Sequence, residues 1–549
     1  MDLRGKVLGP EHPYTLTSMT NIASTYSDQG KYGEAAELNL KVVDLHRKVL
    51  GPEHPHTLTC MANLASIYSN LGKYEEAAEL RLKVVDLHKK VLGPEHPHTL
   101  TCMNNLAVAF SEQGKHVEGG QLLLKVLDLQ KKVLGPEHPS ILTSMANFVS
   151  TYSNQGKYEE AVELELKVVD LHRKMLGPEH PYTLTCMANV ASTYADQGKY
   201  EEAAELYLKV VDLRRKVLGP EHPDSLTSIN HLAVTFSKQG KHEEAEELEL
   251  KALDLHKKVL GPEHPDTLTS MASLASTYSN QGKYEEAVEL KLKVVDLHRK
   301  VLGPEHPHTL TCVANLASAY SDQGKYEEAA ELNLKVADLC KKVLGPEHPN
   351  TLTSMVNLAS TYSDQGKYGE AADLNLKVVD IHRKVLGPEH PHTLTCMANL
   401  ASIYSDLRKY EEAEELELKA LDLCKKVLGP EHPDTLTSMK NLASTYSDQG
   451  KYDEAVELKL KVVDLHRKVL GPEHPDTLTS MDNLAVKFSD QGKYEEAEEL
   501  ELKVLGVHKR VLGPEHPHTL NSMMNLAKTY LAQQKYEEAE KLQMEIQTI

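Results

Sequence analysis

Several features that most large proteins share are scarce in this sequence of 549 residues. Trp is absent, Phe occurs four times, and no Pro lies outside one short motif, a distribution that excludes a mosaic of different domains. Cations are in deficit, with 61 Lys and Arg against 81 Asp and Glu and a net charge of −20. This balance disfavours a surface for duplex nucleic acid or an anionic membrane, because phosphate binding needs concentrated cations.

Long apolar runs are also missing. No stretch of about 18 apolar residues occurs, so the sequence predicts no membrane-spanning helix and no membrane insertion. The first residues, MDLRGKVLGPEHP, lack the apolar core of a signal peptide. Hydrophobic residues nevertheless make up 40% of the chain and recur with helical spacing, which argues against disorder.

One repeated motif contains all of the proline. Leu-Gly-Pro-Glu-His-Pro is written 13 times and accounts for all 26 Pro. A constant period of roughly 20–50 residues is the signature of a solenoid or array. Here the step is always 42, and the motif glycines stand at 9, 51, 93, 135, 177, 219, 261, 303, 345, 387, 429, 471 and 513.

Each repeat has the pattern of a helical hairpin. In the repeat that starts at Gly51, a first helix of about 14 residues carries an apolar stripe and ends at Gly72. We expect Thr57 or the residue before it to cap this helix. A second helix of about 18 residues starts near Tyr74. The spacings of its apolar residues place them on two sides, so it can contact its own partner helix and the next repeat. The stripe residues are Leu58, Met61, Leu64, Ala65 and Tyr68 in the first helix, and Ala77, Leu80, Val84, Leu87 and Val91 in the second, with Leu82 and Val85 beside it.

These residues resemble the tetratricopeptide repeat. The family pattern W-x2-L-G-x2-Y, then Ala, then an aromatic, then Pro is matched here with Met in the Trp place and Ala in the Gly place. The period of 42, the longer second helix and the motif loop are similar to the repeats of kinesin light chains, and to the arrays of nephrocystin-type and NB-ARC-containing proteins. The matching residues are Met61, Leu64, Ala65, Tyr68, Tyr74, Ala77 and Pro94.

The resemblance implies a fold and a function. The fold is an all-α, right-handed superhelical solenoid of about 13 hairpins. The implied function is a non-enzymatic scaffold or adaptor, most like the cargo-binding part of a kinesin light chain, located in the cytoplasm and associated with the cytoskeleton. Its partners are extended segments of other proteins, among them motor or cargo proteins. The alternative is the sensing or scaffold array of an NB-ARC or nephrocystin-type protein. Neither the heptad region of a light chain nor the P-loop of an NB-ARC protein occurs in this sequence.

The expected organisation follows the repeat. Residues 1–8 match the tail of a second helix, so we interpret them as part of a preceding repeat and suspect a fragment of a longer protein. Residues 9–512 form twelve repeats. Residues 513–549 form a capping repeat, which carries the polar changes that a terminal unit needs to face water.

No arrangement of residues predicts catalysis or a cofactor. The carboxylates repeat 13 times on solvated helix faces, whereas an enzyme site needs a unique constellation. Five His follow the motif, as Glu-His-Pro-His, and could hold a metal weakly. The Cys and carboxylates do not converge on them as a closed zinc site requires, so we interpret them as loop residues and predict no metal. These five are His56, His98, His308, His392 and His518.

The seven Cys are predicted to be free thiols. Equivalent positions in successive repeats lie two helix widths of about 8–10 Å each apart, beyond the ~7 Å that a disulfide spans between Cα atoms. Free thiols indicate a reducing compartment. No fixed basic partner for a reactive thiol is evident in the sequence. Cys60, Cys102, Cys186, Cys312 and Cys396 share one column, and Cys340 and Cys424 share the column of His46.

A column of Asn is the candidate binding site. A column here means the equivalent positions of successive repeats. This one lies just before the buried Leu-Ala pair of each first helix, which turns it toward the inner face. The resemblance implies that such an amide bonds the backbone of an extended ligand; alternatively, it bonds the neighbouring repeat and orders the stack. The column is Asn21, Asn63, Asn105, Asn147, Asn189, Asn315, Asn357, Asn399, Asn441, Asn483 and Asn525, with His231 and Ser273 in two repeats.

Variation between repeats suggests where specificity lies. The Thr20 column, beside the Asn column, varies, and we expect it to set ligand choice. The Asn39 column varies more widely, and we expect it on the solvated outer surface. The Lys that chaperone-binding members of the family use to clamp a carboxylate is replaced by Thr17 and its equivalents. The inner columns are mostly uncharged or acidic, which favours neutral or basic ligands over the acidic Trp peptides of kinesin light chains.

Overall fold

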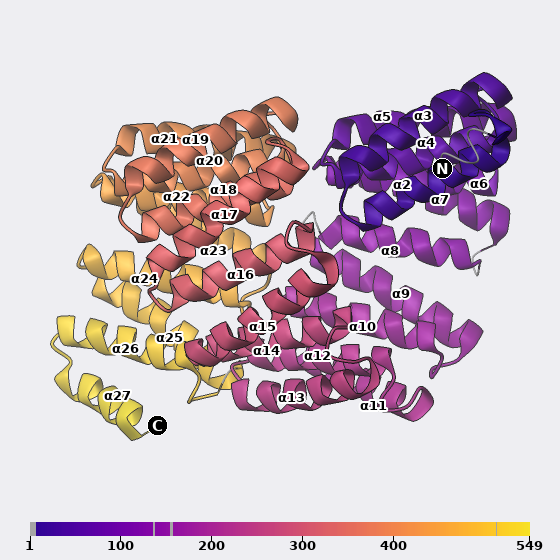
Figure 1. The fold of residues 1–549 in the computed structure, drawn as a ribbon. Coiled ribbons are helices and arrows are strands. Elements are labelled where there is room, and N and C mark those ends of the chain that lie inside the picture. The colour runs from indigo at the N-terminus through magenta and orange to yellow at the C-terminus, as the bar shows by residue number, and fades with distance from the viewer. Residues whose placement is uncertain (1–6, 136–137, 154–156, 512, 549) are drawn as a thin grey trace. The chain divides into compact units, whose positions relative to one another are not determined.

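The computed structural model describes residues 7–135, 138–153, 157–511 and 513–548. Across these ranges the chain forms 26 helices and no strand (Figure 1), which confirms the all-α prediction. The helices alternate between a first helix that begins at the last Pro of the motif and a second helix that begins at Tyr or His. Of the predicted preceding repeat, only residues 7 and 8 lie within the described ranges.

The first helices are 15 or 16 residues long. They are α2 (Pro13–Asp28), α4 (Pro55–Asn70), α6 (Pro97–Glu112), α8 (Pro139–Ser153), α10 (Pro181–Asp196), α12 (Pro223–Lys238), α14 (Pro265–Asn280), α16 (Pro307–Asp322), α18 (Pro349–Asp364), α20 (Pro391–Asp406), α22 (Pro433–Asp448), α24 (Pro475–Asp490) and α26 (Pro517–Ala532).

The second helices are 18 or 19 residues long, apart from the 13-residue α27. They are α3 (Tyr32–Leu50), α5 (Tyr74–Leu92), α7 (His116–Leu134), α9 (Tyr158–Leu176), α11 (Tyr200–Val217), α13 (His242–Val259), α15 (Tyr284–Leu302), α17 (Tyr326–Leu344), α19 (Tyr368–Val385), α21 (Tyr410–Val427), α23 (Tyr452–Val469), α25 (Tyr494–Val511) and α27 (Tyr536–Thr548).

The motif loop starts each first helix through its His. At α4, the Nδ1 of His54 accepts a hydrogen bond from the N–H of His56 at 3.2 Å, and Pro55 occupies the first helical position, where its missing N–H costs nothing. The expected cap, Thr57, instead donates its hydroxyl to the carbonyl of Gly51 at 2.8 Å. The prediction for Thr57 was therefore wrong, because an imidazole nitrogen satisfies the helix end and frees the hydroxyl to hold the loop.

The first helix ends in a left-handed glycine. Gly72 has a φ of 71°, its N–H bonds the carbonyl of Ser69 at 2.9 Å, and the N–H of Lys73 bonds the carbonyl of Tyr68 at 2.9 Å. This pair of bonds is the Schellman arrangement, which satisfies the last carbonyls of the helix. The ammonium of Lys73 lies 5.9 Å above the Tyr68 ring, a cation–π contact that recurs in many repeats.

The apolar stripes form the core as predicted, with two exceptions. Leu58, Met61, Leu64 and Ala65 are buried, and burial of each large side chain contributes roughly 1.5–3 kcal/mol. Leu82 and Val91 of the second helix are exposed. They follow the helical spacing but lie where α5 faces solvent.

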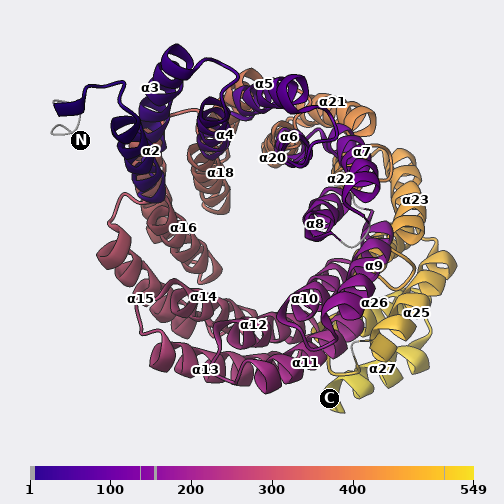
Figure 2. The ribbon, with the colours of Figure 1, turned by 90° about the vertical axis from the view of Figure 1, so that its right-hand side faces the viewer.

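The second face of each second helix packs on the next repeat. Val85 of α5 belongs to one cluster with Leu100, Met103 and Leu106 of α6. Burial of Val85 therefore requires the following hairpin, which is why hairpins stack in tandem. Figure 2 shows α4 and α6 on the inner side of α5 and α7.

The chain divides into two compact units, each built from two separate segments. The first contains Met1–Cys186 and Leu260–Cys396, and the second contains Met187–Val259 and Met397–Ile549. Within the first unit, His348 Nε2 lies 3.0 Å from the carbonyl oxygen of Asn70, 278 residues away. Because Nδ1 of His348 accepts the N–H of Asn350, Nε2 carries the proton and donates this bond.

The second unit has a matching arrangement. His474, at the start of α24, lies against the turn after α10, where a Cβ placed on Gly198 would be 2.9 Å from its Cδ2 atom. A Cβ placed on Gly198 would lie 2.5 Å from Cδ of Pro475. In each unit, a turn after a first helix thus lies against a motif loop from a distant repeat.

Candidate functional site

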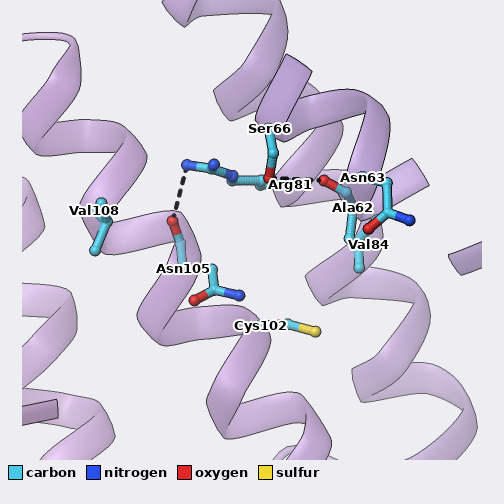
Figure 3. A pocket seen from close by; sticks show the side chains of 8 residues that line it. All are labelled: Ala62, Asn63, Ser66, Arg81, Val84, Cys102, Asn105 and Val108. Atoms are coloured by element: carbon cyan, nitrogen blue, oxygen red, sulfur yellow. Dashed lines mark hydrogen bonds between the residues drawn. The ribbon is translucent and has the colours of Figure 1, made fainter. Parts of the chain in front are cut away.

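The candidate groove is the line of positions between successive first helices, and its geometry is clearest at the pocket between α4 and α6. A pocket of about 280 Å³ is bounded by these two helices and by α5 (Figure 3). Asn63 and Asn105 stand on its walls, and Arg81 crosses its floor. The remaining lining residues are Ala62, Ser66, Val84, Cys102 and Val108.

Arg81 is held in place by the next repeat. Its Nη1 donates to the carbonyl of Asn105 at 3.3 Å and lies 3.5 Å from Oε2 of Glu112. Burial lowers the pKa of the Arg81 guanidinium, and the charge of Glu112 offsets that effect. Ser69 also donates to the same carboxylate oxygen, at 2.7 Å. The cation is therefore neutralised within the groove and does not present a free positive charge to a ligand.

The Asn column lies on the accessible wall of the groove. Each of its side chains is exposed or half-exposed, and none makes a hydrogen bond within the described residues. The amide groups of this column are therefore accessible, and no hydrogen bond of theirs links neighbouring repeats within the described residues. Exposed are Asn21, Asn63, Asn105, Asn189, Asn315, Asn399 and Asn483; half-exposed are Asn147, Asn357, Asn441 and Asn525.

The Asn39 column lies beneath the groove, so its predicted outer position was wrong. Asn39 is 2% exposed, Tyr207 2% and Glu249 0%. The column falls on the stripe of Ala36, Val43 and His46, three and four residues apart, and so faces the next first helix. That spacing could have shown its position, but the polar residues in it suggested solvent. We call it the floor column: Asn39, Arg81, Leu123, Glu165, Tyr207, Glu249, Lys291, Asn333, Asn375, Glu417, Lys459, Glu501 and Gln543. Gln543 lies in α27, the last helix, and is exposed.

Charge along the floor column varies between repeats. Lys291 resembles Arg81, since burial lowers its pKa while Asp322 counteracts the shift. Glu417 has the opposite setting: burial raises its pKa to about 7, Thr445 partly offsets this through a hydrogen bond, and Asp448 and Glu414 raise it further. Arg81 and Lys291 thus have an acid of the next repeat nearby, whereas the acidic Glu417 faces further acids. Lys459 differs from both, since burial lowers its pKa and the charge of Lys487 lowers it further.

The thiols have basic neighbours that the sequence did not reveal. Cys60 Sγ lies 3.8 Å from Nδ1 of His46, and Cys396 Sγ lies 3.3 Å from Nδ1 of His382, each from the preceding second helix. Nδ1 of His46 also lies 3.0 Å from the carbonyl of Val42, so it acts as a donor and does not withdraw the thiol proton. Burial raises the pKa of Cys396 to about 11. These thiols are therefore packed side chains with little thiolate character.

The described residues contain no group of three or more His, Cys, Asp or Glu that could hold a metal ion. In the same part of the chain, no helix combines the length and the apolar character needed to cross a membrane. All seven Cys are free, as predicted. The accessible amides of the groove are thus the chemically distinctive feature of the inner face.

Comparison with known families accounts for this architecture. The tetratricopeptide repeat description matches residues 15–56 and, in overlapping stretches, residues 62–118, 111–174, 150–216, 183–258, 238–300, 273–342, 312–384, 356–426, 407–467, 445–507 and 502–549. The chain belongs to the tetratricopeptide repeat family. The resemblance inferred from the motif spacing is therefore confirmed.

Solved structures of similar proteins include kinesin light chain-type repeats. Two crystal structures of nearly identical repeats of a kinesin light chain-like protein from Podosopora anserina share 38% identity, cover 37% and 38% of this chain and 97% and 98% of theirs, and have TM-scores of 0.34 and 0.33. Yeast Tom70 shares 16% identity over 97% of this chain and 99% of its own, with a TM-score of 0.44. No curated protein matches this chain.

Proposed function

We propose that this tetratricopeptide array is a non-enzymatic scaffold that binds extended segments of partner proteins in the groove lined by the Asn column. The observation that carries the proposal is that these amides are accessible and lack partners in the described residues. An amide offers both a donor and an acceptor, and so matches the N–H and C=O groups of an extended backbone. Folds of this family generally serve as interaction scaffolds.

We infer further that the protein acts as an adaptor of the kinesin light chain type in the cytoplasm, with motor or cargo proteins as partners. The 38% identity to kinesin light chain-type repeats supports the type. The seven free Cys support a reducing compartment, because such thiols would be oxidised outside the cell.

The proposed ligands are neutral or basic segments. The basic floor residue Arg81 is neutralised by Glu112, while the acidic floor residue Glu417 lies near Asp448. Burial raises the pKa of Asp406, and the nearby charge of Asp448 raises it further. Acidic peptides would be repelled from this part of the groove, and cationic peptides would be attracted over a distance of about 8 Å at physiological salt.

A peptide array tests the proposal. Fluorescent peptides that are neutral, basic, or acidic with a Trp are scored against the full chain at two salt concentrations. The test variant replaces four column residues by Ala: Asn315, Asn357, Asn399 and Asn441. The control replaces four exposed acids of the second helices by Asn: Asp338, Asp380, Asp422 and Asp464.

We expect neutral and basic peptides to bind the native chain and the control, and to lose at least about tenfold in affinity with the test variant, since several backbone hydrogen bonds disappear. Preferential binding of acidic Trp peptides would overturn the proposed ligand class. Binding that is indifferent to the four Asn→Ala changes would overturn the proposed site.

A further inference from the structure

A second pocket, of about 340 Å³, lies in the second unit where the groove meets a distant turn of the chain. Helices α24 and α26 form its walls, with α25 behind them, and the turn at Gly198 and the end of α12 close one side. Its lining residues are Gly198, Tyr200, Lys238, Glu473, Pro475, Leu478, Thr479, Asp482, Asn483, Val486, His508, His516, His518, Asn521 and Asn525. Asn483 and Asn525 belong to the Asn column, so this pocket is continuous with the groove.

Asp482 distinguishes its repeat from the other twelve. It occupies the Thr20 column, where the remaining residues are Thr, Ala, Asn, Val, Lys or Met, and it is the only acid of that column in the sequence. Its Oδ1 is buried and has no hydrogen-bond partner among the described residues. A carboxylate oxygen held away from water without a partner makes ionisation of the group costly, and a ligand that supplies a partner recovers that cost.

The neighbouring groups do not neutralise Asp482. Glu501 of α25, which is 2% exposed, interacts with Asp482 as a like charge. Among the described residues its carboxylate accepts one hydrogen bond, from Thr529 Oγ1 at 3.1 Å. Glu473 is already paired with Arg510 at 2.5 Å. The lining of the pocket thus includes the acceptor carboxylate of Asp482 and the amides of Asn483 and Asn525.

Two histidines that line the pocket, His508 and His516, add no positive charge near neutral pH. Burial lowers the pKa of His508 and of His516 to about 4. His508 Nδ1 lies 2.9 Å from the Ser522 hydroxyl, and His516 Nδ1 accepts from the N–H of His518 at 3.1 Å, so both rings are engaged within the protein. The cation that lines the pocket among the described residues is Lys238, which interacts with the charge of Asp196.

We propose that this pocket accepts a Lys or Arg side chain of the segment bound in the groove, with its cationic N–H groups donating to Asp482 and to the amide oxygens of Asn483 and Asn525. The inference rests on the proposed function, that the groove takes extended segments, and adds a defined position at which a basic residue is required. A cation on a flexible stem fits a pocket whose apolar residues, here Leu478, Pro475 and Val486, accompany an unpaired carboxylate.

The experiment compares three short peptides that differ at one central residue. That residue is Lys, its uncharged isostere norleucine, or Glu, in an otherwise neutral Ala-Ser sequence, and affinity is read by fluorescence anisotropy on the full chain. Asp482→Asn keeps the size and removes the charge. Asp464→Asn makes the same charge change on the exposed face of α23 and is the matched control.

The Lys peptide should bind the native chain and the D464N control about tenfold or more tightly than the norleucine peptide, and the Glu peptide most weakly. In the D482N variant, the Lys and norleucine peptides should bind equally. Because D482N removes a buried charge, it should fold at least as well as the native chain, and circular dichroism verifies this.

Equal binding of the Lys and norleucine peptides to the native chain would overturn the inference while leaving the scaffold function intact. So would an equal loss of Lys-peptide affinity in D482N and D464N, which would indicate general charge attraction. Failure of all three peptides to bind would overturn both, and the peptide array with the Asn column variant then identifies the failure of the scaffold function separately.

Discussion

At the residue scale, the repeat shows its constraints where a repeat departs from the common pattern. The turn after each first helix needs a left-handed residue, which is Gly72 in the second repeat. In the tenth repeat this residue is Arg408, with a φ of 59°, and it makes the same turn bond, 2.8 Å from its N–H to the carbonyl of Ser405. A side chain in this conformation costs roughly 1–2 kcal/mol.

Arg408→Gly should therefore stabilise the tenth repeat, by about 0.5–1 kcal/mol once the greater flexibility of Gly in the unfolded chain is included. Hydrogen exchange of α20 and α21 measures the local change. Arg408→Ala is the control, since it removes the side chain but keeps a Cβ in the strained conformation. A gain of the same size in both variants would show that the long side chain, and not the backbone, was responsible.

Buried carboxylates of the floor column give a pH dependence of stability. Burial raises the pKa of Glu501 to about 7, above its value in the unfolded chain, with Asp482 and Glu498 adding to the shift and Thr529 opposing it. The folded state therefore binds the proton more tightly, and the stability that the neutral acid provides is present at low pH and lost as the pH rises through 7.

Glu501→Gln should stabilise the array at pH 8 by on the order of 3 kcal/mol and change it little at pH 4. Urea unfolding of both forms at the two pH values measures the difference. Glu499→Gln, on the same helix, is the control, because Glu499 is exposed and paired with Lys503 at 2.7 Å. A gain at pH 4 as large as that at pH 8 would contradict the assignment to ionisation.

At the element scale, one side chain of the motif has two roles. Each motif His caps its own first helix through Nδ1, as His54 and His348 both do. His348 additionally donates Nε2–H to the carbonyl of Asn70 at 3.0 Å. The imidazole of His348 thus caps its own helix through one nitrogen and links two distant repeats through the other.

Substitution of the two His residues should separate these roles. His54→Ala loses a cap and should destabilise α4 by about 1 kcal/mol, whereas His348→Ala should cost about 1 kcal/mol more at α18, because a second hydrogen bond is lost. His348→Asn restores a good cap but cannot reach Asn70, so it should recover only part of the loss. Hydrogen exchange of α4 and α18 reports each value; full recovery with Asn would argue against the long-range bond.

At the scale of the whole molecule, the array is more than a chain of nearest neighbours. Stacked repeats normally couple only to adjacent repeats. Within the first unit, hydrogen bonds between motif loops and turns also join repeats 278 residues apart. In the second unit, the turn at Gly198 lies against Pro475. A Cβ on Gly72 would lie 2.2 Å from Cδ of Pro349, so the distant segment approaches too closely for any side chain.

Gly72→Ala should destabilise both segments, while Gly366→Ala should affect only its own repeat. The two glycines have similar φ values of 71° and 75°, so the backbone strain is matched, but a Cβ on Gly366 meets nothing within 4 Å. We expect Gly72→Ala to cost about 1–3 kcal/mol more, through overpacking, and to speed exchange at the start of α18. Equal effects of the two variants would contradict the contact between distant segments.

Local sequence determined the helices and one wall of the groove. The period of 42, the apolar stripes and the helix-ending Gly predicted the hairpins, because hydrogen bonds and side-chain spacing within a helix act over three or four residues. The same spacing placed Asn63 and its equivalents on the inner face, where the structure has them accessible. The family followed from these features alone.

The tertiary structure decided which polar residues are buried and which distant repeats meet. The sequence pattern predicted that Glu501 and Arg81 are solvated, yet the next first helix covers them. The contact of Gly72 with Pro349 and the pocket at Asp482 depend on the rotation between successive hairpins, which is set by side-chain packing at each interface and accumulates over several repeats. The accumulated rotation is not encoded in any short stretch of sequence, so local sequence patterns could not predict these contacts.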